Sequence, residues 1–293
     1  HGTIDLRLEE FELPEITDGE ILACVISDSI CMSSYKAASQ GSAHKRVPAD
    51  IAENPVIIGH EFCGKIEKVG AKWSDKFKPG DKFVIQPAIN YKGSLASPGY
   101  SYKYCGGAAT YVIIPEEVML MDCLLPYDGD AFFYGSLAEP MSCIVGGFHA
   151  NYHSKPGVYV HEMGTKPSGN MAILAGAGAM GLGCADYAIH GGTPPKLLVV
   201  TDLDTARLER AEKLLSPEEA KKYGVDLRFI NTAEYENPTE YLRSLTNGEG
   251  YNDVFVYAPV RPVVEMGDTL LSRDGCLNFF AGPTNPEFSA MFN

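Results

Sequence analysis

The chain has 293 residues, of which 45% are hydrophobic and 21% are charged, and its formal net charge is −14. This composition excludes an intrinsically disordered chain, and the length is near the upper limit for one hydrophobic core, so we expect two folded domains. The negative charge disfavours nucleic acids and anionic membranes as partners, because both would repel the chain.

The eight cysteines are scattered without a C-x-x-C pair, which disfavours a disulfide framework and a four-cysteine zinc site. The first twenty residues lack the apolar segment of a signal peptide, and no apolar run reaches the roughly 18 residues of a membrane span. We therefore expect a cytoplasmic protein. Because the chain begins without Met, we also expect its natural start to lie further upstream.

The first part of the chain, up to residue 125, predicts strands and turns. The alternating stretch TIDLRLEEFELP predicts a half-buried strand at 3–14, and EILACVISDSIC predicts a more buried one at 20–31. A Pro-Gly-Asp turn introduces another strand within 78–87, and GGAATYVIIPEEVMLM predicts a pair of strands within 106–121. We therefore expect an antiparallel, β-rich domain with long loops.

After Asp128 the pattern changes to alternating strands and helices. Residues 131–153 predict a helix that is interrupted at Pro140, and 154–169 predict a linker or a hairpin. The remaining strand candidates are 171–175, 196–202, 226–231, 252–258 and 276–282, and the helix candidates are 179–190, 204–215, 237–246 and 260–272. This alternation predicts a doubly wound parallel sheet.

The stretch ILAGAGAMGLG contains the pattern G-x-G-x-x-G at Gly176, Gly178 and Gly181. The pattern alone is a weak signal in a chain with 30 glycines, but here an apolar strand precedes it and an amphipathic helix follows it. In such a loop the first glycine permits a tight turn, the second lets the backbone approach a pyrophosphate, and the third lets the helix pack on the strand. The context therefore predicts a dinucleotide-binding site.

Asp202 ends the next predicted strand, about 20 residues after the last glycine, where a carboxylate binds the ribose of the cofactor. The alternative is that Asp202 only caps the following helix. Because Asp204 lies close by, a 2′-phosphate would meet two carboxylates, so we expect NAD, whereas Arg207 keeps NADP open. The expected cofactor-binding residues are Gly176, Gly178, Met180, Gly181, Asp202, Arg207 and Ala258.

The segment NPVIIGHEFCGKIEKVG places His60 and Glu61 side by side after an apolar run. This segment resembles the zinc-containing medium-chain alcohol and polyol dehydrogenases. Four further segments resemble the same family, in the family's order: ISDSICMSSYKAASQG, FKPGDKFV, GSLAEPMSCIVGGFHA and LVVTDLDTARLERA. Within the family, the sequence is most similar to sugar-alcohol dehydrogenases and ketose-phosphate reductases.

The resemblance implies a GroES-like antiparallel β catalytic domain at 1–150 and a doubly wound Rossmann domain at 151–293. It also implies a zinc ion bound by Cys31, His60 and Glu61, with Glu139 as a fourth ligand or as the acceptor for a water at the site. The implied reaction converts a secondary alcohol or polyol into the ketone or ketose, and back, by hydride transfer. Whether the substrate is a sugar phosphate stays open. A small-molecule substrate and a homodimer or homotetramer follow from the same resemblance.

The residue types at the implied metal site suit this chemistry. A thiolate, a carboxylate and a neutral imidazole balance a dication and leave a position open for an oxygen. Zinc then acidifies an alcohol or polarises a ketone, and the nicotinamide exchanges the hydride. Each residue alone also has an ordinary explanation: Cys31 as a small apolar core residue, His60 and Glu61 as partners in a surface ion pair, and Glu139 as the end of a helix. Their joint occurrence beside a dinucleotide fold favours the metal site.

Ser33 and Lys36 follow Cys31 in the same segment. The resemblance implies that the hydroxyl of Ser33 relays the substrate proton, and the alternative is a loop-capping residue. At Lys36 the family often has a relay histidine, but a charged lysine has no acceptor lone pair for that role. Our hypothesis is that Lys36 binds an anionic substrate group such as a phosphate, and the alternative is an ordinary solvated lysine.

Two segments depart from the family pattern. The cysteine-rich lobe that holds a structural zinc corresponds to AINYKGSLASPGYSYKYCGG, which contains only Cys105, so we expect one catalytic zinc and no structural zinc. The chain stops at FAGPTNPEFSAMFN, before the last strand of the family's second sheet, so we expect it to be incomplete at both ends.

Two other functions compete with the dehydrogenase. A metal-free enone or quinone reductase has the same architecture, but Cys31, His60 and Glu61 disfavour it. A dinucleotide-binding protein without turnover stays open because of the expected truncation.

Overall fold

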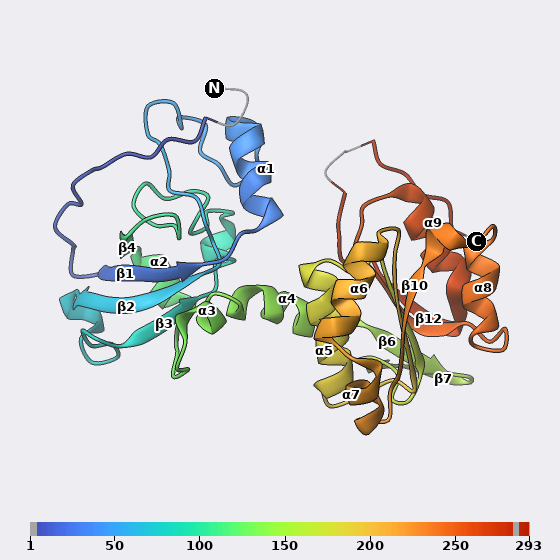
Figure 1. Cartoon of the computed structure of the whole chain (residues 1–293). Coiled ribbons are helices and arrows are strands. Elements are labelled where there is room, and N and C mark those ends of the chain that lie inside the picture. The colour runs from blue at the N-terminus through green and yellow to red at the C-terminus, as the bar shows by residue number, and fades with distance from the viewer. Residues whose placement is uncertain (1–4, 284–286, 293) are drawn as a thin grey trace. The chain divides into compact units, whose positions relative to one another are not determined.

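The computed structural model of the chain describes residues 5–283 and 287–292. It divides into two compact units, His1–Pro140 and Met141–Asn293 (Figure 1). Helix α4 (Ala138–Ala150) crosses this division, and the boundary between functional domains after residue 150, at the end of this helix, stays a prediction. Within the described residues, no helix has the length and apolar character needed to cross a membrane.

The first unit contains a five-stranded antiparallel sheet in the order β4-β1-β2-β3-β5. Its strands are β1 (Ile21–Asp28), β2 (Phe62–Val69), β3 (Lys82–Ile85), β4 (Tyr111–Ile114) and β5 (Leu124–Pro126). Its helices are α1 (Met32–Gln40), α2 (Glu116–Leu120) and α3 (Phe132–Gly135), with 3₁₀ turns η1 (Gly41–Ala43), η2 (Ala71–Trp73) and η3 (Tyr91–Gly93).

Buried apolar side chains of these strands form the core of the first unit. Phe62 and Phe83 meet edge to face, with ring centroids 6.1 Å apart. In the register of β1 and β2, Asp28 is opposite Phe62, so the end of β1 lies beside the residues that precede β2. This pairing brings the segment of Cys31 next to the segment of His60.

Two predictions for the first unit are wrong. The described part of the predicted strand at 3–14 is not a strand, and its apolar side chains, such as Leu8, are exposed. Apolar alternation cannot make a strand where no neighbouring strand pairs with it. The second strand expected within 106–121 is the helix α2, which Pro115 introduces and which has two glutamates in its first turn.

The second unit contains a five-stranded parallel sheet in the order β10-β9-β8-β11-β12. Its strands are β8 (Asn170–Leu174), β9 (Leu197–Asp202), β10 (Asp226–Asn231), β11 (Tyr251–Val256) and β12 (Leu271–Asn278). Its helices are α5 (Ala179–His190), α6 (Thr205–Leu214), α7 (Pro217–Lys222), α8 (Pro238–Ser244) and α9 (Arg261–Leu270), with the 3₁₀ turn η4 (Thr232–Glu234).

Helices cover both faces of this sheet (Figure 1). Met171 and Ile173 of β8 pack in a cluster with α5, whereas Ala172 and Leu174 pack in a cluster with α8 and α9. Both faces are therefore buried, which explains the uninterrupted apolar runs of the strands. The expected fold class, with a doubly wound sheet after the antiparallel domain, is confirmed.

In the second half of the chain, three elements can be compared with the sequence predictions. Helix α4 continues through Pro140, because proline is tolerated in the first turn of a helix, so the expected interruption there is wrong. The segment 154–169 is largely a hairpin of β6 (Tyr152–Lys155) and β7 (Val158–Met163), one of the two expected outcomes. Strand β12 begins at Leu271, earlier than predicted.

Candidate metal centre and dinucleotide loop

Three side chains from two segments meet at one end of the first sheet. Cys31 is the N-cap of α1, and His60 and Glu61 directly precede β2. The sulfur of Cys31, an imidazole nitrogen of His60 and a carboxylate oxygen of Glu61 all lie within 4.8 Å of one another. His60 and Glu61 are only 4% and 5% exposed, and Cys31 is half-buried. The structure thus brings together the three residues for which the sequence predicts a shared ion.

The turn before His60 requires glycine. Gly59 has a φ of +93°, and a Cβ atom at this position would lie 2.3 Å from a carboxylate oxygen of Asp28 and 2.8 Å from the backbone nitrogen of Ala108. Its carbonyl accepts a 2.7 Å hydrogen bond from the backbone of Gly107. Only glycine fits this turn without strain, and the turn presents His60 and Glu61 on the same side of β1 as Cys31.

Hydroxyl groups surround the imidazole of His60. The Oγ of Ser34 lies 3.2 Å from Nδ1, and the hydroxyl of Tyr100 lies 3.2 Å from Nε2. Nε2 also lies 3.8 Å from Oε1 of Glu61, while Ser29 donates a hydrogen bond to Oε2 of Glu61. Nε2 is therefore the nitrogen that faces the carboxylate, and Ser34 orients the ring from its other side.

Burial sets the ionisation of this cluster. It raises the pKa of the Cys31 thiol, and the negative charge of Glu61 adds to this effect, against opposing hydrogen bonds from Ser33. It lowers the pKa of His60, so the imidazole is neutral and has a lone pair for a metal. Burial also raises the pKa of the neighbouring Asp28 to about 6. The donor set therefore fits a dication, whose binding would displace the thiol proton.

The other predicted residues of this site lie around the cluster. The backbone nitrogen of Ser33 lies 3.5 Å from the sulfur of Cys31, and Lys36 follows one turn later on α1. Glu139 lies in the first turn of α4. Burial raises the pKa of Tyr100, and charges on Cys31 and Glu139 add to this effect. Among the described residues, Glu139 is not part of the 4.8 Å cluster, and its role as ligand or water acceptor stays a prediction.

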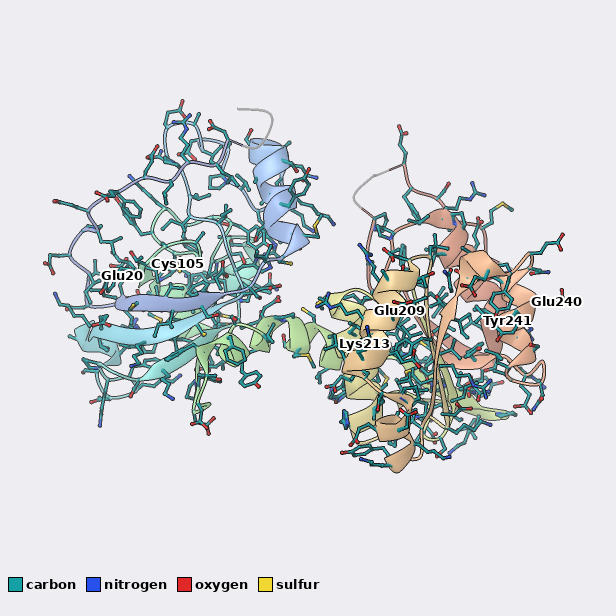
Figure 2. The ribbon with its side chains drawn as sticks, in the orientation of Figure 1. Glu20, Cys105, Glu209, Lys213, Glu240 and Tyr241 are labelled. Atoms are coloured by element: carbon teal, nitrogen blue, oxygen red, sulfur yellow. The ribbon has the colours of Figure 1, made fainter. Side chains whose placement is uncertain are left out.

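Tyr100 is a residue of this site that the sequence does not reveal. It is 6% exposed, and its hydroxyl group faces the imidazole of His60. The chain contains 16 tyrosines, and no motif distinguishes this one. By contrast, Cys105 is fully buried within the core of the first unit (Figure 2), where burial raises the pKa of its thiol.

The surroundings of Gly178 and Gly181 fit the roles predicted for them, whereas their contact with a cofactor stays a prediction. A Cβ atom at Gly181 would lie 2.2 Å from the carbonyl oxygen of Gly176, so α5 packs directly against the turn after β8. Gly178 is the N-cap of α5, and a Cβ atom there would meet no atom within 4 Å. The loop is therefore open at the position where a pyrophosphate would approach.

Asp202 holds the dinucleotide loop to the end of β9. Its Oδ2 accepts a 3.3 Å hydrogen bond from the backbone of Ala177, and its Oδ1 accepts bonds from the backbone of Leu203 and Asp204. The cap of α6 is Asp204, which accepts bonds from the backbone of Ala206 and Arg207. The alternative that Asp202 merely caps this helix is therefore wrong.

The last three predicted cofactor-binding residues border this loop in the sequence or in the sheet. Met180 is half-buried in the first turn of α5, Arg207 forms a 3.7 Å ion pair with Asp204, and Ala258 follows β11. Their contact with a cofactor stays a prediction.

Comparisons with known proteins place the chain in a family. Residues 17–123 match the alcohol dehydrogenase GroES-like domain. The chain is 53% identical to mannitol-1-phosphate 5-dehydrogenase of Aliivibrio fischeri and 48% identical to L-sorbose 1-phosphate reductase of Klebsiella pneumoniae; the alignments cover the whole chain and 69% and 70% of these relatives. The chain belongs to the zinc-containing medium-chain alcohol and polyol dehydrogenases.

A solved structure of this family has the same fold. The crystal structure of 2R,3R-butanediol dehydrogenase of Bacillus subtilis matches with a TM-score of 0.70 at 19% identity, covering the whole chain and 78% of that protein. The expected family and fold are confirmed, and so is the expectation that the chain is an oxidoreductase of the alcohol or polyol dehydrogenase type. This medium-chain dehydrogenase contains a candidate metal site in its GroES-like unit.

Proposed function

We propose that this chain is a zinc- and NAD-dependent dehydrogenase that interconverts a secondary alcohol of a polyol and the ketone of the corresponding ketose. The observation that carries this proposal is the convergence of Cys31, His60 and Glu61 within 4.8 Å. The names of the two relatives favour a phosphorylated substrate, since both refer to sugar 1-phosphates or polyol 1-phosphates.

The donor set supports zinc as the ion. A softer sulfur donor beside an imidazole and a carboxylate suits zinc better than magnesium or calcium, which prefer oxygen ligands alone. Zinc bound there would supply Lewis-acid polarisation of the substrate oxygen. The residues of the chain orient the donors: Ser34 holds the ring of His60, and Ser29 holds the carboxylate of Glu61. Ser33 is the residue that we assign to the transfer of the substrate proton.

The dinucleotide loop of the second unit supports NAD. Gly178 leaves the N-terminal end of α5 open to a pyrophosphate, and Gly181 lets α5 pack against the turn of Gly176. The carboxylates of Asp202 and Asp204 would repel a 2′-phosphate, whereas Asp202 suits a ribose hydroxyl. We therefore assign NAD rather than NADP, with a single catalytic zinc and no structural zinc.

Zinc analysis and activity test this proposal together. Protein expressed with added zinc should contain about one zinc per chain and should oxidise NADH with ketoses or ketose phosphates, and a chelator should abolish this activity. Cys31→Ser should lose the zinc, whereas the control Cys143→Ser, at an exposed position, should keep it. Absence of zinc after metal-replete expression would favour a metal-free reductase or a protein without turnover.

The remaining features follow from the same proposal. We assign a catalytic domain at 1–150 and a cofactor domain at 151–293, and we propose a cytoplasmic homodimer or homotetramer that acts on a small molecule. Size-exclusion chromatography with light scattering tests the oligomeric state. A monomer at micromolar concentration would contradict it.

A further inference from the structure

One segment of this acidic chain has the opposite charge. Residues 29–49 contain no aspartate or glutamate, although the chain as a whole has a net charge of −14. The same segment contains Lys36, His44, Lys45 and Arg46. The ion pairs formed within the described part of the chain involve none of the three cationic residues Lys36, Lys45 and Arg46. Among the residues that the structure describes, no carboxylate therefore pairs directly with these three charges.

The fold gathers this segment around Tyr100. The imidazole of His44 stacks on the ring of Tyr100, with centroids 5.7 Å apart and an interplanar angle of 7°. The guanidinium carbon of Arg46 lies 5.9 Å from the centroid of the same ring. The hydroxyl of Tyr100 in turn lies 3.2 Å from Nε2 of His60. The ring of Tyr100 thus lies between the side chains of His44 and Arg46 and the imidazole of His60.

The hydrogen bonds of His44 and Arg46 leave N–H groups of both side chains available to an anion. Nδ1 of His44 accepts a 3.3 Å bond from the backbone of Arg46, so the proton of the neutral ring lies on Nε2. Arg46 uses Nη1 for the carbonyl of Leu95, at 3.0 Å, and has further N–H groups in its planar fork. Lys36 lies on α1 one turn after Ser33, and residues at this spacing share a helix face.

The electrostatics of His44 are consistent with this gathering. Its pKa is lowered first by burial and then by the positive charges of Arg46, Lys45 and Lys36. Three cations, one on α1 and two in the turn after η1, therefore act on one imidazole. Such a concentration of uncompensated positive charge beside a buried site attracts a doubly charged anion more strongly than it attracts a neutral sugar.

We propose that Lys36, His44 and Arg46 bind the phosphate group of a phosphorylated polyol or ketose, with Lys45 adding charge at the exposed rim. This inference rests on the proposed function, because it assumes that the reacting carbon of the same substrate lies at the metal centre beyond Tyr100. It extends the hypothesis for Lys36 to a site of three side chains that the sequence alone does not assemble.

Two variants and a matched control test the phosphate site. Lys36→Gln and Arg46→Gln each remove one cation, and Lys78→Gln removes an exposed lysine on another loop of the same unit. With zinc-loaded protein and NADH, kcat/KM for L-sorbose 1-phosphate should fall ~10-fold or more in both site variants, whereas the value for L-sorbose should stay within about twofold of wild type. The control should match wild type on both substrates.

Binding of inorganic phosphate to the zinc-free protein gives a readout that does not require turnover. Calorimetric titration should detect phosphate binding to wild type and to Lys78→Gln, and weaker binding to both site variants. Equal losses on both sugars, or phosphate binding that is absent from wild type or unchanged in the site variants, would overturn the phosphate site. If wild type reduces neither sugar, the proposed function fails, and the titration alone decides the phosphate site. Should Arg46→Gln unfold because it loses the bond to Leu95, Lys36→Gln decides.

Discussion

The Oγ atom of Ser34 lies 3.2 Å from Nδ1 of His60, on the side of the imidazole away from Glu61. The opposite nitrogen, Nε2, faces the carboxylate of Glu61 and the hydroxyl of Tyr100. The contact with Ser34 therefore holds Nδ1 on one side of the ring and leaves Nε2 to face the cluster. This division of the two ring nitrogens is the usual arrangement of a histidine that binds a metal.

Ser34→Ala should therefore weaken zinc binding without removing a ligand. Loss of such a supporting hydrogen bond typically lowers metal affinity ~10- to 100-fold, because the ring is no longer held in one orientation. Competition with a chromophoric chelator measures this affinity. The matched control is Ser39→Ala on the same helix, where the hydroxyl bonds to the carbonyl of Lys36 and zinc affinity should not change. Equal zinc affinity in the two variants would contradict this role of Ser34.

The sequence predicts those parts of the site that depend on local patterns. His60 and Glu61 follow a glycine whose positive φ the fold requires, and a Cβ atom would meet open space at Gly178 and backbone at Gly181, as expected. Family resemblance then identifies Cys31 as their partner across β1 and β2. These features are predictable because each depends on a few neighbouring residues with a fixed geometry.

The parts that the sequence does not predict depend on contacts between distant segments. Tyr100 reaches His60 from a long stretch between β3 and β4 with little regular structure, so no periodicity places its hydroxyl. The apolar alternation around Leu8 predicts a strand, but no neighbouring strand pairs with it. Asp204 rather than Asp202 caps α6. The backbone geometry determines which aspartate is the cap, and the sequence alone does not distinguish two aspartates so close together.

Gly178→Ala should separate cofactor binding from stability. A Cβ atom there meets nothing within 4 Å in the protein, so the melting temperature should stay within about 2 °C of wild type, whereas a pyrophosphate approaching the loop would meet the added methyl group. We expect NADH affinity to fall ~10-fold or more, measured by NADH fluorescence. Gly192→Ala, which is equally free of close contacts, is the control and should bind NADH normally. Unchanged affinity in Gly178→Ala would argue against a pyrophosphate at this loop.

Asp28→Asn should change how the stability of the zinc-free protein depends on pH. The folded state raises the pKa of Asp28 from 3.8 to about 6, so folding is favoured by protonated Asp28 at low pH, and this contribution is lost as the pH rises through 6. The full shift corresponds to roughly 3 kcal/mol, which solvent screening of this half-buried group reduces to about 1–2 kcal/mol.

Urea denaturation of chelator-treated protein measures this difference. Asparagine cannot ionise, so Asp28→Asn should be more stable than wild type by about 1–2 kcal/mol near neutral pH, relative to their difference near pH 4. The amide oxygen of the asparagine can still accept the hydrogen bond that the backbone of Glu61 donates to the Asp28 side chain. Parallel stability profiles for the two proteins would show that Asp28 has an ordinary pKa in the folded state.

Asp253 ties together three segments of the second unit. Its Oδ1 accepts bonds from Nδ2 of Asn151, at 2.7 Å, and from Nε2 of His153, at 3.1 Å, and its Oδ2 accepts a 2.8 Å bond from the backbone of Lys166. Asp253 is 1% exposed and His153 is 3% exposed. The other ring nitrogen of His153 bonds to the backbone carbonyl of Asp274. The carboxylate thus connects β11 to the start of the β6–β7 hairpin and to the segment after it.

Asp253→Asn should destabilise the second unit strongly, because the asparagine amide places donors against groups that already donate. A buried donor that is left without an acceptor typically costs ~1–3 kcal/mol, and Asn151, His153 and Lys166 all donate to this carboxylate. The control is Asp226→Asn, which breaks an exposed pair with Arg228 and should cost less than about 1 kcal/mol. Urea denaturation followed by circular dichroism compares the two. A similar small cost for both variants would mean that the Asp253 carboxylate is dispensable for holding the hairpin to the sheet.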